Sequence, residues 1–299
     1  MVPVVSILIP TFNRAATIER AIESGLLQDV AVPFEVVVVD NASDDGSSDL
    51  ISAMAAEDSR IVYRRWSENL GPIENWRRGL DIARGDWIKV VWSDDWIVPT
   101  AVRLLLEAAQ SHDCVVATCR AHISQPHGEF EDYDKEAFTY EANDVFRALS
   151  GLGRSLPWSP GAALVRRLDA ISGLRALRTP EACVRAAIGP DVAMLYWGVV
   201  TGGQGVHVPA ALAQFDGKHG SITIREGRHR VSACYDSTLM SLARAAGVEP
   251  PPDVVRAVKH RAALYGLRGV SSEMRFPDRR LSPPLLARSV ARRIRRAVI

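Results

Sequence analysis

The chain contains few cysteines and no long apolar run. The first shortage argues against a zinc site, and the second argues against a membrane-spanning helix. Its four cysteines form no C-x-x-C pair and have no companion histidine at the spacing of a zinc site. We therefore expect reduced thiols in a cytosolic protein. No stretch approaches the ~20 apolar residues of a membrane-spanning helix, and the run from Val4 to Ile9 lacks the flanks of a signal peptide. These absences predict a soluble protein of the cytoplasm.

An excess of one charge sign is also missing, because 36 Lys and Arg residues face 35 Asp and Glu residues. Such a balance does not favour a protein that grips nucleic acid along its whole surface. No G-x-G-x-x-G sequence follows the first apolar run and no G-x-x-x-x-G-K-[ST] sequence occurs. A dinucleotide fold and a P-loop are therefore disfavoured. Any nucleotide must be held in a different way.

Short apolar runs alternate with helix-period segments from residue 4 to about residue 120, a pattern typical of β-α units around a mostly parallel sheet. Helices should cover both faces, because continuous apolar strands are buried on both sides. The expected strands are 4–9, 34–39, 61–65, 87–91 and 114–118, and the expected helices are 15–27, 47–56, 73–83 and 100–110. Further on we expect loops at 125–143 and 156–162, strands at 162–166 and 206–215, and helices at 191–199, 224–246, 253–266 and 285–298.

The last segment, Leu285 to Ile299, interleaves arginines with aliphatic residues. That pattern suits an anionic membrane surface. A terminal helix docked on its own domain, with a solvated arginine face, explains it equally well. Both alternatives remain open from the sequence.

Polar residues follow three of the predicted strands, at the edge where α/β sheets bind ligands. Thr11 to Arg14 follow the first strand, Asp40 to Ser47 the second, and Ser93-Asp94-Asp95 the fourth. Adjacent carboxylates repel unless a cation or strong donors lie between them. Mg²⁺ and Mn²⁺ prefer one or two such carboxylates together with substrate phosphates. A capping and turn cluster is the alternative explanation for the acid pair.

Together these segments resemble glycosyltransferase family 2, over roughly the first two-thirds of the chain. The resemblance implies an α/β fold of the GT-A type, a Rossmann-like, mostly parallel sheet flanked by helices, over residues 1–222. A nucleotide-sugar half would end near residue 120, an acceptor half would cover 121–222, and a helical C-terminal extension would cover 223–299. The motifs that carry the resemblance are Val5 to Arg14, Val38 to Gly46, Asn69-Leu70-Gly71, Asn75, Gly79, Ala83 to Ile88, and Ser93-Asp94-Asp95.

The resemblance implies transfer of a sugar, with inversion, from a UDP- or dTDP-linked donor to the hydroxyl of a saccharide or lipid-linked acceptor. Assembly of bacterial cell-surface polysaccharide or glycolipid, on the inner face of the cytoplasmic membrane, would be the setting. Asp40 would accept hydrogen bonds from the pyrimidine or ribose, and Arg14 would face phosphate. The nucleotide-sugar residues implied are Pro10, Thr11, Asn13, Arg14, Asp40, Asn41, Asn69, Ser93 and Asp94.

The metal motif departs from the family pattern. The family's D-x-D sequence would place an acid at position 92, where this chain has Trp92. Asp94 and Asp95 would therefore have to hold the Mg²⁺ or Mn²⁺. His219 lies in a segment similar to one in which a family histidine returns to the metal or diphosphate. A structural or merely exposed loop histidine is the alternative.

Asp191 is the candidate base that deprotonates the acceptor hydroxyl. Its segment, Gly189 to Met194, is similar to the family stretch that supplies the catalytic acid residue, usually as a pair, and Pro190 replaces the first acid here. Asp191 also suits the N-cap of the following helix, and both roles can coexist. Trp158, just before an acceptor-like loop, is a candidate for stacking on a sugar ring.

Two other functions remain open. Trp92 and Pro190 permit a non-catalytic relative that binds a nucleotide sugar or glycan without turnover. A nucleotidyltransferase would be expected to show a Gly-rich, basic loop after the first strand, and the chain has none there.

Overall fold

The computed structural model describes residues 2–125, 128–177, 183, 187–217 and 228–264. Within them one sheet runs in the strand order β3-β2-β1-β4-β9-β6-β10-β5, with β7 on β6 and β8 on β10. The strands are β1 (Val5–Thr11), β2 (Phe34–Asp40), β3 (Ile61–Arg65), β4 (Trp87–Val90), β5 (Trp96–Ile97), β6 (Val116–Gln125), β7 (Gly128–Asp132), β8 (Phe138–Tyr140), β9 (Ala163–Arg166) and β10 (Gly205–Asp216). The helices are α1 (Ile18–Leu26), α2 (Ser47–Glu57), α3 (Pro72–Ile82), α4 (Ala101–Ser111), α5 (Ala142–Leu149), α6 (Arg167–Ala176), α8 (Pro190–Val200), α10 (Arg228–Ala246) and α11 (Pro252–Leu264), with a 3₁₀ turn η1 (Pro160–Ala162).

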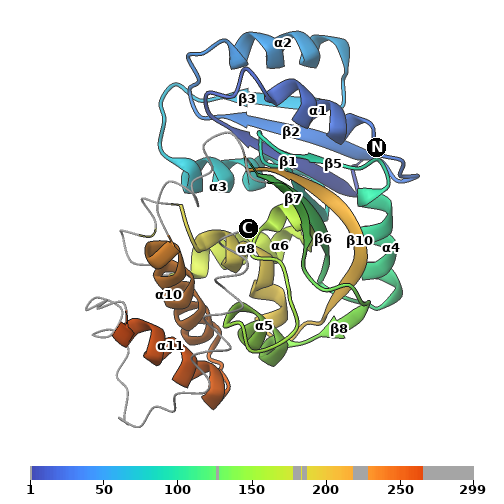
Figure 1. Cartoon of the computed structure of the whole chain (residues 1–299). Helices are drawn as coiled ribbons and strands as arrows, with labels where there is room; N and C mark the ends of the chain where they lie inside the picture. The colour runs from blue at the N-terminus through green and yellow to red at the C-terminus, as the bar shows by residue number, and fades with distance from the viewer. Residues whose placement is uncertain (1, 126–127, 178–182, 184–186, 218–227, 265–299) are drawn as a thin grey trace.

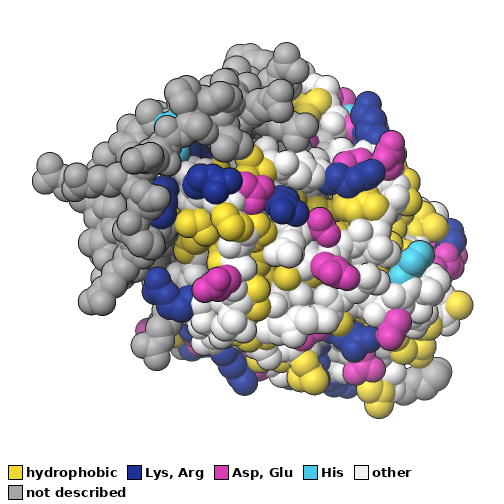
Figure 2. Space-filling view, turned by 90° about the horizontal axis from the view of Figure 1, so that it is seen from below, with side chains coloured by type: hydrophobic (Ala, Val, Ile, Leu, Met, Phe, Trp, Pro, Cys, Tyr) yellow, Lys and Arg dark blue, Asp and Glu magenta, His cyan; other side chains and the backbone are white. Residues whose placement is uncertain are grey.

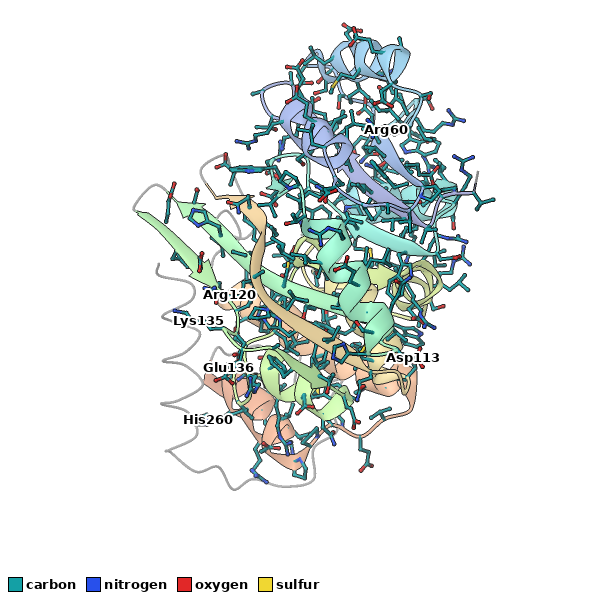
Figure 3. The ribbon with its side chains drawn as sticks, turned by 90° about the vertical axis from the view of Figure 1, so that its right-hand side faces the viewer. Arg60, Asp113, Arg120, Lys135, Glu136 and His260 are labelled. Carbon is teal, nitrogen blue, oxygen red and sulfur yellow. A yellow bond between two sulfur atoms is a disulfide. The ribbon has the colours of Figure 1, made fainter. Side chains whose placement is uncertain are left out.

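The N-terminal half is the predicted set of β-α units. β3, β2, β1 and β4 pair in parallel, so their carboxyl ends share one edge. α1 and α2 lie on one side of these strands and α3 on the other (Figure 1). This double cover explains why β1 is buried along its whole length. Figure 3 shows Arg60 in this half, at the opposite end of the molecule from His260.

The second half mixes strand directions. β9 runs antiparallel to both β4 and β6, whereas β10 is parallel to β6. The predicted parallel pairing therefore holds for β1 to β4 and for the β6–β10 pair, and the short strand β9 reverses the direction between these two groups.

The loop predicted over residues 125–143 is wrong, because this stretch contains β7, β8 and the start of α5. β7 is largely exposed and alternates acidic residues with a single phenylalanine. An ion pair between Arg120 and Glu131 joins it to β6, and His122 lies within hydrogen-bond distance of Glu129, at 3.2 Å. Because cross-strand charge pairs take the place of apolar burial, hydropathy alone did not reveal this strand.

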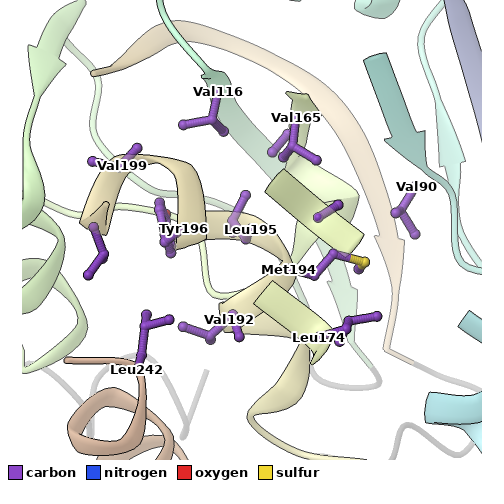
Figure 4. Close-up of a cluster of buried hydrophobic side chains, with 14 of the residues drawn as sticks. Val90, Val116, Val165, Leu174, Val192, Met194, Leu195, Tyr196, Val199 and Leu242 are labelled. Carbon is purple, nitrogen blue, oxygen red and sulfur yellow. The ribbon is translucent and has the colours of Figure 1, made fainter. Parts of the chain in front are cut away.

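The C-terminal helices share the core of the second half. Figure 4 shows Leu242 of α10 beside Val192 of α8 in one buried apolar cluster. Arg261 of α11 is only 1% exposed, and its guanidinium donates at 2.7 Å to both carboxylate oxygens of Asp236 in α10. Arg261 also donates at 3.2 Å to the carbonyl of Ser150, which ties α11 to the end of α5.

The expectation of reduced thiols is wrong for one pair, because Cys183 and Cys234 form a disulfide. The two residues lie 51 positions apart with no paired motif, so spacing did not expose them. Cys114 and Cys119 are free and buried.

In the described residues, no helix is both long and apolar enough to cross a membrane. Figure 2 shows a face on which basic and acidic side chains are interspersed with apolar ones, in keeping with the balanced composition. His219 and the segment Leu285 to Ile299 lie outside the described residues.

Candidate active site

The loops that follow β1 and β2 are joined to each other. The backbone N–H of Asn13 donates to the hydroxyl of Ser43 at 2.9 Å, and that of Arg14 donates to the hydroxyl of Ser47 at the same distance. The Asn13 amide exchanges two further hydrogen bonds with Asp44, at 2.9 and 3.0 Å. Asn13 adopts φ 51°, which asparagine tolerates better than most residues. Two segments 30 residues apart thus form one rigid rim.

Asp40 ends β2 and is fully buried. One carboxylate oxygen accepts hydrogen bonds from the backbone N–H and the hydroxyl of Ser43, at 3.0 and 2.5 Å. The other accepts from the Tyr63 hydroxyl at 3.1 Å and lies 3.6 Å from the guanidinium of Arg65. Burial, together with the charge of Asp40, raises the pKa of Tyr63, so the phenol stays a donor. The carboxylate is held in one orientation.

Asn41 and Asn69 hold the neighbouring loop. The Asn41 amide donates to Asn69 at 2.7 Å and its oxygen accepts from the backbone N–H of Leu70 at 3.2 Å. The oxygen of Asn69 also accepts from the N–H of Gly71 at 2.9 Å. Gly71 has φ 85°, in the left-handed region that favours glycine, and immediately precedes α3. Both asparagines therefore shape the rim.

Thr11 is the last residue of β1, next to Asp40 across the β1–β2 pair. It is 3% exposed, and its hydroxyl has no hydrogen-bond partner in the described part of the chain. Pro10 lies one residue earlier, opposite Val39. A buried hydroxyl without a partner is costly unless a ligand or water supplies one. Thr11 is thus a candidate contact for a bound group.

The turn after β4 carries the predicted acid pair. The N–H of Asp95 donates to the carbonyl of Trp92 at 2.9 Å, which closes the turn. The hydroxyl of Thr17 donates to the carbonyl of Ser93 at 2.8 Å, and Arg20 donates to that of Asp94 at 2.7 Å. Side chains at the start of α1 thus hold the turn through its backbone carbonyls.

The two carboxylates differ in their surroundings. Asp95 accepts a hydrogen bond at 2.8 Å from the backbone N–H of Asp216 at the end of β10. Asp94 lies 3.7 Å from the Arg14 guanidinium, which comes from the loop after β1. Arg20 lies 3.3 Å from the Asp216 carboxylate and stacks 3.9 Å from the Trp96 ring centroid. The acid turn thus faces the first loop on one side and β10 on the other.

Burial disfavours the charged form of both carboxylates at this turn. Burial raises the pKa of Asp94, and Arg14 opposes that rise. Burial and the charge of Asp94 raise the pKa of Asp95 well above its ordinary value. A cation placed here would lower both pKa values and stabilise the two carboxylates.

Lys89 lies in β4 beneath the acid turn and is fully buried. Its amine donates to the carbonyl of Val90 at 2.9 Å and to the carbonyl of Gly161 in η1. Burial lowers the pKa of Lys89 to about 8, while the charge of Asp95 acts in the opposite direction. Lys89 therefore ties the strand below the acid turn to the segment 157–162.

Trp92 occupies the place of the expected acid. Its indole N–H donates to the Ser159 hydroxyl at 2.8 Å, and its ring packs 5.2 Å from that of Trp76. The position therefore serves as a second link from the acid turn to the segment 157–162, and it supplies no metal ligand.

Asp191 lies in the first turn of α8 and is 8% exposed. One carboxylate oxygen accepts from the N–H of Gly189 at 3.0 Å, and the other accepts from the Tyr235 hydroxyl of α10 at 3.5 Å. Burial raises the pKa of Asp191 to about 7, against the opposing effect of these hydrogen bonds. The group can exist in both protonation states near neutral pH, which suits proton transfer.

The sequence profile of the family described as "Glycosyl transferase family 2" matches residues 6–167, more than half of the chain. The chain belongs to glycosyl transferase family 2. The match covers β1 to β9 with the rim loops and the acid turn, and it ends before α8 and α10.

The chain is similar to the succinoglycan biosynthesis protein ExoO of Rhizobium meliloti (strain 1021). The two are 39% identical over 116 residues, which make up 39% of this chain and 32% of that protein. This chain therefore matches about a third of the relative's length.

Solved structures share the fold at low sequence identity. S. aureus TarS 1-349 in complex with UDP-GlcNAc is 17% identical, with a TM-score of 0.66 over 99% of this chain and 81% of that one. The mannosyltransferase PcManGT of Pyrobaculum calidifontis, in complex with GDP-Man and Mn²⁺, has a TM-score of 0.53 at 17% identity, over 99% of this chain and 75% of its own. The GT-A fold expected from the sequence is confirmed.

The structure arranges the predicted site residues of this family 2 member in two groups. The nucleotide-side residues form one rim, to which Arg14 connects the acid turn. Asp191 belongs to a second group, with Tyr235 of α10. Sequence reasoning assigned no role to Tyr63, Lys89 or Tyr235. Their contacts come from the packing of distant segments, and no local motif marks them.

Proposed function

We propose that this family 2 member transfers a sugar from a UDP- or dTDP-linked donor to the hydroxyl of a saccharide or lipid-linked acceptor. The observation that carries the proposal is the contact between the loop after β1 and the acid turn after β4. Arg14 of the first loop lies 3.7 Å from Asp94, in a turn where burial raises the pKa of two adjacent carboxylates. A diphosphate is bound by basic side chains and by a divalent cation, and this arrangement offers Arg14 for the first role and carboxylates that would hold the second.

The nucleoside part of the donor would lie on the rim formed by the loops after β1 and β2. Asp40 is held by Ser43 and Tyr63. The Thr11 hydroxyl beside it has no hydrogen-bond partner among the described residues. A hydrogen bond with a pyrimidine or ribose would satisfy the Thr11 hydroxyl. Asp40, which already accepts from Ser43 and Tyr63, would accept one further hydrogen bond from the same nucleoside. In this proposal Pro10, Asn13, Asn41, Asn69 and Ser93 shape the rim and the turn through their backbone and amide contacts.

The acid turn fits a Mg²⁺ or Mn²⁺ ion. In the described residues no group of three acidic, histidine or cysteine side chains could hold a metal. A hard cation bound with a diphosphate, however, needs only one or two protein carboxylates. Asp94 would be the main ligand, because Asp95 already accepts the N–H of Asp216, and His219 remains a candidate third ligand. When bound, such an ion neutralises the charge that develops on the departing diphosphate.

Asp191 would act as the base. A pKa near 7 allows its carboxylate to take the proton of an acceptor hydroxyl at neutral pH. Attack by that hydroxyl on the sugar carbon breaks the bond to the diphosphate oxygen and inverts the configuration. The proton moves to Asp191, and the diphosphate leaves with the electron pair.

A role in bacterial cell-surface polysaccharide or glycolipid assembly fits the similarity to a succinoglycan biosynthesis protein. Location at the inner face of the cytoplasmic membrane rests on the arginine-rich segment Leu285 to Ile299. Deletion of 285–299 should reduce binding to anionic vesicles and leave transfer to a soluble acceptor intact. Unchanged vesicle binding would count against this location.

A binding panel tests the donor proposal. Wild type, Asp94→Asn and the control Asp113→Asn, an exposed acid outside the site (Figure 3), would be titrated with UDP, dTDP and GDP, with and without Mn²⁺. We expect thermal stabilisation by one diphosphate that depends on Mn²⁺ and is lost in Asp94→Asn alone. Equal stabilisation with and without Mn²⁺ would refute the metal proposal.

A non-catalytic relative that binds a nucleotide sugar is the second candidate, favoured by Trp92 in place of an acid. This hypothesis predicts that the protein binds the nucleotide-sugar donor but transfers the sugar to no acceptor. Turnover of the bound donor would exclude it.

A further inference from the structure

We propose that Tyr235 of α10 is a positioning residue of the transfer reaction, which orients the Asp191 carboxylate toward the acceptor hydroxyl. The inference rests on the proposed role of Asp191 as the base. It adds a residue from a helix beyond the span of the family match, which ends at residue 167.

Close contact between α10 and the start of α8 brings Tyr235 to Asp191. Gly189, just before α8, has φ 107°, and a Cβ there would lie 2.1 Å from the Thr238 hydroxyl oxygen of α10. Glycine is therefore required on both conformational and steric grounds. The disulfide from Cys234 to Cys183 fixes α10 one residue before Tyr235. The close packing of α10 on the start of α8 thus places the Tyr235 phenol beside the Asp191 carboxylate.

Trp158 holds the Tyr235 ring from the other side. The two ring centroids lie 4.5 Å apart at an interplanar angle of 63°, an edge-to-face contact. The backbone on both sides of Trp158 is anchored, because the Tyr196 hydroxyl donates to the Pro157 carbonyl at 2.7 Å and Ser159 accepts from Trp92. The position of Tyr235 is therefore linked, through segment 157–159, to the acid turn.

The phenol hydrogen bond also favours the charged form of Asp191. In the described part of the chain, the groups that face this carboxylate are the Tyr235 hydroxyl of α10 and the backbone N–H groups of Gly189, Asp191 and Val192. Asp169 of α6 lies against Gly198, near the other end of α8. Tyr235 is thus the side chain that stabilises ionised Asp191, and its loss should make the base harder to ionise.

The test is the pH dependence of kcat/KM for Tyr235→Phe, measured with the full chain, donor and acceptor. The acid limb should move to higher pH, because the variant keeps the ring and removes only the hydroxyl. We expect about a two- to tenfold loss near pH 6 and a smaller loss near pH 8.5. Tyr140→Phe is the matched control, since its buried hydroxyl bonds to Thr118 at 3.4 Å and does not touch Asp191. Its acid limb should stay in place.

Three outcomes separate the inference from its premise. If Asp191→Asn retains wild-type turnover, the base assignment fails. If Asp191→Asn is inactive but Tyr235→Phe leaves the acid limb unmoved, the positioning role alone is overturned. Should Tyr235→Phe unfold, Trp158→Leu provides the second measurement, because it removes the ring that holds Tyr235. A limb that moves to higher pH in Trp158→Leu supports the proposal, and an unmoved limb refutes it.

Discussion

Replacement of Lys89 by methionine should change stability in a way that depends on pH. The amine is fully buried, and burial lowers its pKa from 10.5 to about 8. Between these two pH values the unfolded chain binds the proton more tightly than the folded protein does. The folded protein therefore gains stability as pH rises through this window, by about 2 kcal/mol between pH 7 and pH 9.5.

Lys89→Met cannot show this gain, because methionine does not titrate. At pH 7 the variant loses the charge that is costly to bury, but it leaves the carbonyls of Val90 and Gly161 without their donor. Removal of the buried charge stabilises the variant. Loss of the donor destabilises it, by about 1 to 3 kcal/mol for each carbonyl left without a partner. The difference in unfolding free energy between wild type and variant should therefore grow by about 2 kcal/mol, in favour of wild type, from pH 7 to pH 9.5.

Guanidinium unfolding followed by tryptophan fluorescence at several pH values would measure this difference. Tyrosines whose pKa is raised by burial, such as Tyr140, contribute a slope of the opposite sign at higher pH, but equally in both proteins. Lys135→Met, at an exposed lysine (Figure 3), is the matched control and should show a constant difference. A constant difference for Lys89→Met as well would refute the inference that burial lowers the pKa of this amine.

Three other changes test the packing around the site. Arg261→Met should destabilise the fold by about 3 to 5 kcal/mol in thermal or chemical unfolding, because the buried carboxylate of Asp236 loses the guanidinium that donates to both of its oxygens; a loss below about 1 kcal/mol would contradict the buried pair. Reduction of the disulfide, or Cys183→Ser, should cost about 4 kcal/mol for the 51-residue separation, and equal unfolding midpoints with and without reductant would contradict it. Trp92→Phe should raise the acceptor KM about three- to tenfold with donor affinity unchanged, since the bond to Ser159 is lost while an aromatic ring still faces Trp76. An unchanged acceptor KM would show that this link does not shape the acceptor side.

The N-terminal half was predictable because its signals are local. The continuous apolar run from Val36 to Val39 predicts a buried strand. All four residues are completely buried in β2. The loops after β1, β2 and β4 were likewise predictable, since the carboxyl ends of parallel strands meet at one edge. The rule places these residues together without any knowledge of side-chain contacts.

The features that escaped prediction depend on long-range packing. β7 is stabilised by charge pairs across the strands, and Cys183 meets Cys234 only when α10 packs beside α8. Tyr235 reaches Asp191 across 44 positions of sequence. A single sequence contains no local pattern that reports such contacts.

The transfer reaction itself is the most direct test of the account. Wild type and Asp191→Asn would be assayed for sugar transfer with Mn²⁺, the donor identified by the binding panel and a series of saccharide and lipid-linked acceptors. Wild type should turn over repeatedly, and kcat should fall by about 100-fold or more in Asp191→Asn, with donor binding unchanged. Turnover by Asp191→Asn at the wild-type rate, or donor binding by wild type without any transfer, would contradict it.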